Sequence, residues 1–140
     1  MNHRIRAHTP CELIELLSRH RTTIQTFLVS SLCDPLTSRG RMLEESIVLD
    51  RASRLVDALL RSTRSEATAL AESVLRMAED AIREGLHAGE VLKALNLLDE
   101  KVCTILREQG PVGSRDRASV LIRERFRVAR EALSRFLNAA

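Results

Sequence analysis

Apolar residues recur at steps of three and four along most of the chain, and no segment alternates polar and apolar residues. This spacing places apolar side chains on one face of an α-helix, whereas a half-buried strand would need strict alternation. Only three of the 140 residues are aromatic, which disfavours the aromatic-rich strands of a β-sandwich or barrel. The sequence therefore predicts an all-α protein.

Five helices are expected from the apolar stripes and from the residues that start and stop helices. Thr9, Pro10 and Glu12 form a start signal for the first helix, which ends before the break at Pro35. Gly85 provides a stop for the third helix, and the segment "GPVGS" separates the last two. The predicted ranges are about 10–31, 44–62, 65–85, 90–109 and 114–137. The fourth range is apolar on more than one side, which is typical of the central helix of a bundle.

The expected architecture is one domain over residues 1–140, with the polar residues 1–8 frayed. It is a single helical bundle with short connections, for which globin-like packing is one arrangement. No apolar run approaches the roughly 18 to 20 residues that cross a bilayer, so we expect no membrane segment. The three cysteines are widely spaced, and their odd number without a signal-peptide segment favours a reducing cytoplasm.

The patterns that usually mark catalysis or metal binding are missing from the sequence. There is no nucleophile elbow, no glycine-rich phosphate loop and no cysteine or histidine cluster with zinc spacing. Glu-x-x-His occurs once, at Glu84–His87, whereas a di-metal bundle needs such a motif on each of two helices. We therefore expect that the chain is not an enzyme, with no catalytic residue, no metal site and no cofactor.

His20 is the one weak candidate for a ligand-binding residue, because it lies on the apolar stripe of the first helix between Leu17 and Ile24. Three roles are open to it. It could carry a phosphoryl group, although "SRHRTT" lacks the His-x-x-Lys-Gly pattern of phosphotransfer domains. It could ligate haem or a metal together with His87. The favoured role is a partly buried structural histidine beside a small cavity, which could respond to pH near neutrality.

Charge is uneven along the chain, whose formal net charge is +3. Residues 66–100 hold eight acids and three bases, whereas residues 115–135 hold seven arginines and three acids. Such helices attract each other or a neighbouring subunit; the alternative is that the basic helix binds nucleic acid or an acidic partner. With so few aromatic residues to stack on bases, nucleic acid is the less favoured partner. Arg123, Arg127 and Arg130, on one side of the last helix, are the candidates for partner contact.

Two stretches resemble the N-terminal domains of RsbR-type regulators, the RsbT co-antagonist proteins of bacterial stress signalling. They are "LLSRHRTTIQTFL" at residues 16–28 and "REGLHAGEVLKALNLLDEKVCTIL" at residues 83–106. The chain departs from the family pattern in two places: Phe27 stands where relatives often have Trp, and "RMAEDAIREG" replaces a His-rich or Arg-rich segment. The second departure puts any ligand site in that segment in doubt.

The resemblance implies an input module that forms a homodimer and is joined to an output domain such as a STAS domain or a histidine kinase. The sequence therefore predicts a non-catalytic signal-input or regulatory module that acts by dimerisation and by contact with a protein partner or a fused output domain. A histidine phosphotransfer protein and a nucleic-acid-binding helical protein are the alternatives.

Overall fold

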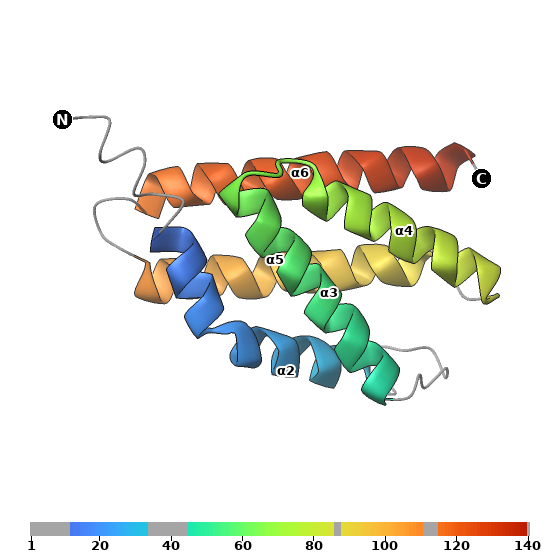
Figure 1. Cartoon of the computed structure of the whole chain (residues 1–140), viewed down its shortest axis with the longest axis horizontal. Helices are drawn as coiled ribbons and strands as arrows, with labels where there is room; N and C mark the ends of the chain where they lie inside the picture. Colours follow the sequence, from blue (N-terminus) through green and yellow to red (C-terminus); the bar gives the residue numbers. More distant parts are fainter. Residues whose placement is uncertain (1–11, 34–44, 86–87, 111–114, 140) are drawn as a thin grey trace.

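The computed structural model describes residues 12–33, 45–85, 88–110 and 115–139, and every regular element among them is a helix. A helical segment at residues 12–19 comes first. The helices that follow are α2 (Arg21–Leu32), α3 (Glu45–Arg64), α4 (Ala69–Arg83), α5 (Gly89–Gln109) and α6 (Arg115–Ala139), and Figure 1 shows their arrangement. The all-α prediction is confirmed for these residues, which form six helical segments.

The predicted first helix is divided in two, which corrects the expectation of one helix over 10–31. His20 has φ −97° and ψ 10°, and the chain changes direction there before α2 begins (Figure 1). The bend separates two groups of buried side chains that a straight helix would have joined into one stripe. They are Leu13, Leu16 and Leu17 before the bend, and Ile24 and Leu28 after it. The start signal at Thr9 and Pro10 lies outside the described residues.

The later helices begin and end close to the predicted residues, except that α4 starts four residues late. Residues 65–68 form the turn between α3 and α4, and the amides of Ser65 and Glu66 both donate to the carbonyl of Arg61. At the end of α4, Gly85 has a φ of +75°, a left-handed conformation that glycine adopts without a steric penalty. The predicted stop at Gly85 is therefore confirmed.

The core is almost entirely aliphatic and is shared by all the helices. Phe126 of α6 is fully buried, whereas Phe27 and Phe136 are partly buried at its edge. The leucine and isoleucine side chains that are buried to 2% exposure or less are Leu13, Leu17, Ile24, Leu28, Leu55, Leu59, Leu70, Leu95, Leu98, Leu106, Ile122 and Leu133. The apolar stripes predicted for the last four helices contribute to this core, so the periodicity identified its main faces.

Helices α5 and α6 run antiparallel side by side, and α4 packs against both of them. Helix α3 packs against α2, α4 and α6. The broad apolar surface of α5 predicted the central helix of the bundle, and the structure covers this surface only in part. Leu92 and Leu97 are only partly buried and line a shallow hollow of about 340 Å³ on the outer side of α5.

Ser62 joins three helices through hydrogen bonds, although its side chain is completely buried. Its hydroxyl donates to the carbonyl of Ala58 at 3.0 Å and accepts the amide N–H of Leu70 in the first turn of α4 at 3.0 Å. The carbonyl of Ser62 accepts a bond from Arg125 Nε of α6 at 2.9 Å. The α3–α4 turn is thereby fixed to α6.

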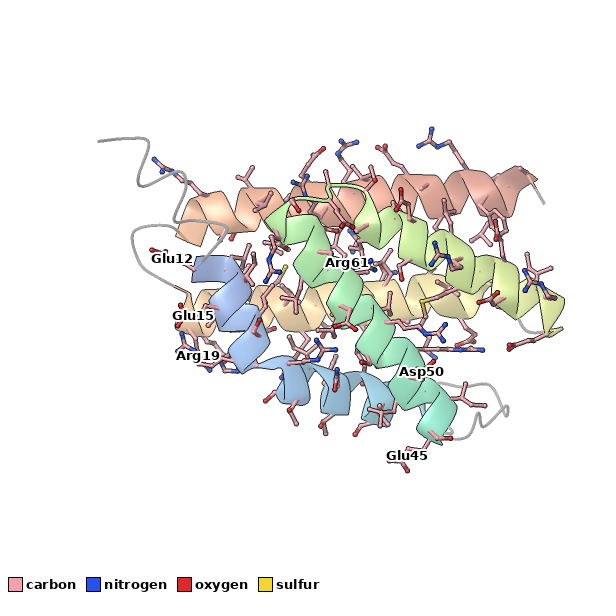
Figure 2. All side chains as sticks on the ribbon, viewed as in Figure 1. Glu12, Glu15, Arg19, Glu45, Asp50 and Arg61 are labelled. Carbon is pink, nitrogen blue, oxygen red and sulfur yellow. The ribbon has the colours of Figure 1, made fainter. Side chains whose placement is uncertain are left out.

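Charged side chains cover the outside of the bundle, as Figure 2 shows for Glu15 and Arg19 on the outer side of the first helical segment. These two form an exposed ion pair one helical turn apart, with 3.5 Å between Arg19 Nη2 and Glu15 Oε1. Among the helices of the described residues, none is both long enough and apolar enough to cross a membrane.

Candidate functional site

His20 lies at the bend between the first helical segment and α2, and its side chain is partly exposed. Its amide donates to the carbonyl of Leu16 at 3.2 Å, and its carbonyl accepts from the amide of Ile24 at 2.9 Å. The prediction that His20 belongs to the buried stripe is therefore only half right, because the residue is partly buried and lies at the bend. Within the described residues its ring has no hydrogen-bond partner.

The neighbourhood of His20 does not assemble a ligand set. In the part of the chain that the structure describes, no three His, Cys, Asp or Glu side chains come together as metal ligands would. His87, the second donor considered from the sequence, lies outside the described residues. A phosphotransfer histidine needs a freely exposed imidazole, and the partial burial of His20 does not favour that role.

Arg21, the residue after the bend, ties α2 to α3. Its Nη1 lies 2.6 Å from Asp57 Oδ1, and its Nη2 donates to the hydroxyl of Ser53 at 3.1 Å. Charge-assisted bonds of this kind are stronger than bonds between neutral groups. The direction that the chain takes after His20 is thus fixed by contacts with α3.

The three arginines predicted for partner contact occupy different environments on α6. Arg127 lies between two acids of its own helix, with Nε 3.0 Å from Glu124 Oε2 and Nη1 2.8 Å from Glu131 Oε1. The hydrogen bond from Arg127 holds the pKa of the Glu124 carboxyl below its usual value. The same ion pairs raise the pKa of Arg127, which stays charged.

Arg130 connects α6 to α5 and is less available to a partner. Its Nε donates to Asn96 Oδ1 at 2.9 Å, and its Nη2 pairs with the carboxylate of Asp99. The attraction expected between the acidic segment and the basic last helix is realised in this pair. Arg123 is exposed and has no carboxylate partner among the described residues, so it is the most available of the three.

Cys103 of α5 faces Asp99, with Sγ 3.3 Å from Asp99 Oδ1. Desolvation of the thiol raises its pKa to about 11, and the hydrogen bond and negative charge of Asp99 act in the same direction. A thiol with so high a pKa is almost entirely protonated near neutral pH, so Cys103 is a poor nucleophile.

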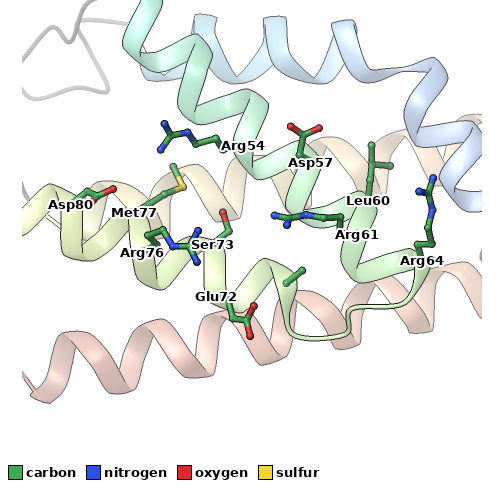
Figure 3. A pocket seen from close by; sticks show the side chains of 11 residues that line it. Arg54, Asp57, Leu60, Arg61, Arg64, Glu72, Ser73, Arg76, Met77 and Asp80 are labelled. Atoms are coloured by element: carbon green, nitrogen blue, oxygen red, sulfur yellow. The ribbon is translucent and has the colours of Figure 1, made fainter.

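A groove of about 600 Å³ runs between α3 and α4, and its lining is strongly charged (Figure 3). It is lined by Arg54, Asp57, Leu60, Arg61, Arg64, Ala69, Glu72, Ser73, Arg76, Met77 and Asp80. The two walls belong to neighbouring antiparallel helices, which the short turn at 65–68 joins at one end. At the other end, Arg51 Nη2 of α3 lies 2.9 Å from Glu84 Oε2, just after α4.

The acids of this groove are already engaged with other groups. Asp57 pairs with Arg21 of α2, and Asp80 pairs with Arg83 at 3.4 Å. Glu72 accepts a hydrogen bond from the hydroxyl of Thr68 at 3.3 Å, and Figure 3 shows its carboxylate directed away from the groove arginines.

Arg61 and Arg76 have no ion-pair partner among the described residues, and the same holds for Arg64. Figure 3 shows Arg61 of α3 and Arg76 of α4 directed toward one another across the groove, with the Ser73 hydroxyl between them in this view. Arg64 points away from this pair. The groove is therefore lined by four arginines and three acids, and three of its arginines form no ion pair among the described residues.

Sequence reasoning missed this groove for an identifiable reason. Arg61 follows Asp57 by four residues and Arg76 follows Glu72 by four, the spacing at which helical ion pairs form. The sequence alone would assign each arginine to its helical neighbour. Only the fold shows that Asp57 forms its ion pair with Arg21 of α2, which precedes it by thirty-six residues.

No protein-family model, curated protein or solved structure matches this chain. The resemblance to the RsbR-type N-terminal domains therefore stays a prediction that depends on the two quoted stretches.

Proposed function

We propose that this chain is a non-catalytic signal-input or regulatory module that acts by dimerisation and protein–protein contact. In this proposal it works in the cytoplasm and is coupled to an output domain such as a STAS domain or a histidine kinase. The resemblance of residues 16–28 and 83–106 to RsbR-type regulators supports this proposal. We also propose that the bundle has globin-like packing.

The observation that carries the proposal is the outer face of α6. This helix is 25 residues long, and its inner face is buried through Ala118, Ile122, Phe126, Ala129 and Leu133. On the opposite side Val120 is 65% exposed, and the next turns carry Arg123 and Arg127. An exposed apolar residue bordered by arginines is a composition typical of protein interfaces.

The packing offers a route from the rest of the bundle to this face. Helix α2 packs against α5, and α5 packs against α6 and is tied to it by Arg130 and Asp99. A ligand, partner or pH change that moved the first helices would therefore shift α6 through α5. Helix shifts of about 1–2 Å at a subunit interface are enough to switch other signalling proteins.

The experiment is native mass spectrometry and sedimentation of the purified chain, with the variant Arg123→Glu compared with Arg19→Glu. Both variants change the charge equally at exposed positions, but Arg19 lies on the first helical segment, far along the chain from α6. We expect a dimer that Arg123→Glu weakens and Arg19→Glu does not. A monomer at all concentrations, or equal effects of both variants, would contradict the proposal.

A further inference from the structure

The facing arginines of the α3–α4 groove raise the question of what neutralises them. Arg61 and Arg76 come from different helices and are directed toward one another, and like charges held in this way repel. The nearest acids in sequence form no ion pair with either arginine among the described residues, because Asp57 is paired with Arg21 and Glu72 accepts a hydrogen bond from Thr68. An anion bound between the two guanidinium groups would relieve the repulsion.

The donors present fit a phosphate group better than a carboxylate. One guanidinium fork is enough to satisfy the two oxygens of a carboxylate. Here Arg61 and Arg76 lie on opposite walls with their guanidinium groups directed toward one another in Figure 3, and Ser73, which also lines the groove, can supply a third donor. A tetrahedral phosphate has oxygens directed to several sides, and it can accept bonds from all three groups at once.

The size and floor of the groove indicate that the phosphate belongs to a larger molecule. Small-molecule sites have volumes of roughly 300–1,000 Å³, and the groove encloses about 600 Å³. Leu60, Ala69 and Met77 provide apolar surface beside the arginines. We propose that the α3–α4 groove binds a small soluble organic phosphate, with its phosphate group held between Arg61 and Arg76 and hydrogen-bonded by Ser73.

This site goes beyond the proposed regulatory function, for which it would supply a ligand. The test is a titration of the full chain with phenyl phosphate at low salt, followed by amide chemical shifts in NMR and by calorimetry. Benzoate at equal concentration is the carboxylate control. We expect saturable shifts in the last turns of α3 and the first turns of α4 with phenyl phosphate, and weaker binding of benzoate.

Matched variants locate the site. Arg61→Gln and Arg76→Gln should each weaken phenyl phosphate binding about tenfold or more, the loss expected when one charge-assisted contact is removed. Arg64→Gln removes the same charge from the same groove, but its side chain points away from the pair, so binding should change by less than about threefold. All three arginines are exposed, so the substitutions leave the core intact.

Several outcomes would overturn the inference. They are an absence of shifts in the groove, equal weakening by the three variants, or benzoate binding as tight as that of phenyl phosphate. Tighter binding of a short DNA duplex with a steep salt dependence would reassign the arginines to a nucleic-acid backbone. The titration does not depend on the oligomeric state of the chain. A dimer that fails to bind phenyl phosphate would therefore refute this site alone. A monomer that binds phenyl phosphate would refute only the dimeric mechanism.

Discussion

The hydroxyl of Ser62 is the buried polar group whose removal has the most readily calculated consequence. In Ser62→Ala the volume of the side chain hardly changes, but the amide of Leu70 loses its acceptor at the start of α4. Both Ser62 and Leu70 are 0% exposed, so water does not replace the lost bond without rearrangement. A buried donor left without a partner costs about 1–3 kcal/mol.

The corresponding change in melting temperature follows from the length of the chain. The entropy of unfolding is about 2.1 cal/mol/K per residue, or about 0.3 kcal/mol/K for a chain of this size. The expected loss of 1–3 kcal/mol therefore lowers the Tm by roughly 3–10 °C. Circular dichroism at 222 nm measures the Tm, and hydrogen exchange should show faster exchange of the Leu70 amide in Ser62→Ala.

Thr63→Val is the matched control for this prediction. Thr63 is also buried, and its hydroxyl donates to the carbonyl of Leu59 at 2.8 Å. Removing this hydroxyl leaves no N–H unpaired, and the carbonyl keeps its place in the helix, so the Tm should fall much less than in Ser62→Ala. If both variants lowered the Tm equally, or if the Leu70 amide stayed protected in Ser62→Ala, the assigned role of Ser62 would be wrong.

Phe126→Ala removes the only fully buried aromatic side chain among the described residues. Chemical denaturation should show that the free energy of unfolding falls by about 3–5 kcal/mol. A fall of less than about 1 kcal/mol would contradict the central position of Phe126 in the core. Cys103, whose pKa is raised to about 11, should react slowly with iodoacetamide at pH 8, and Asp99→Asn should speed the reaction by lowering that pKa. Because the folded state holds this proton more tightly than the unfolded chain, the thiol favours folding below pH 9 and this contribution is lost as the pH rises toward 11. Arg21→Ala should weaken phenyl phosphate binding in the titration described above, because Asp57 becomes free to pair with Arg61, one turn further along α3. An unchanged affinity would show that the Arg21–Asp57 pair does not affect anion binding in the groove.

The sequence predicted the helices well because their determinants are local. Steps of three and four defined the buried faces of α3 to α6, and Gly85 marked the end of α4 through its own backbone conformation. The bend at His20 could not be predicted in this way. The residues around it form a continuous apolar pattern, and the contacts that fix the direction of α2 come from Ser53 and Asp57 on α3.

The candidate sites were harder to predict than the fold, because they depend on which charges remain unpaired after folding. Arg127 has Glu124 and Glu131 at helical spacing, so its ion pairs are local, whereas the bond of Arg130 to Asp99 of α5 depends on the fold. The spacing in the sequence predicts ion pairs for Arg61 and Arg76, yet neither forms one among the described residues. For Arg130, Arg61 and Arg76, the partner of each side chain is decided by residues that lie far apart in the sequence and meet only in the fold.

The two walls of the α3–α4 groove are joined by polar contacts near both of its ends, and this affects the ligands that it can select. At one end Ser62 holds the first turn of α4, and at the other the ion pair between Arg51 and Glu84 joins the two walls. Such a cleft is preorganised, so a ligand of the right dimensions loses little affinity to rearrangement of the protein. Selectivity in this groove would therefore come from the fixed spacing of its walls as much as from its charge.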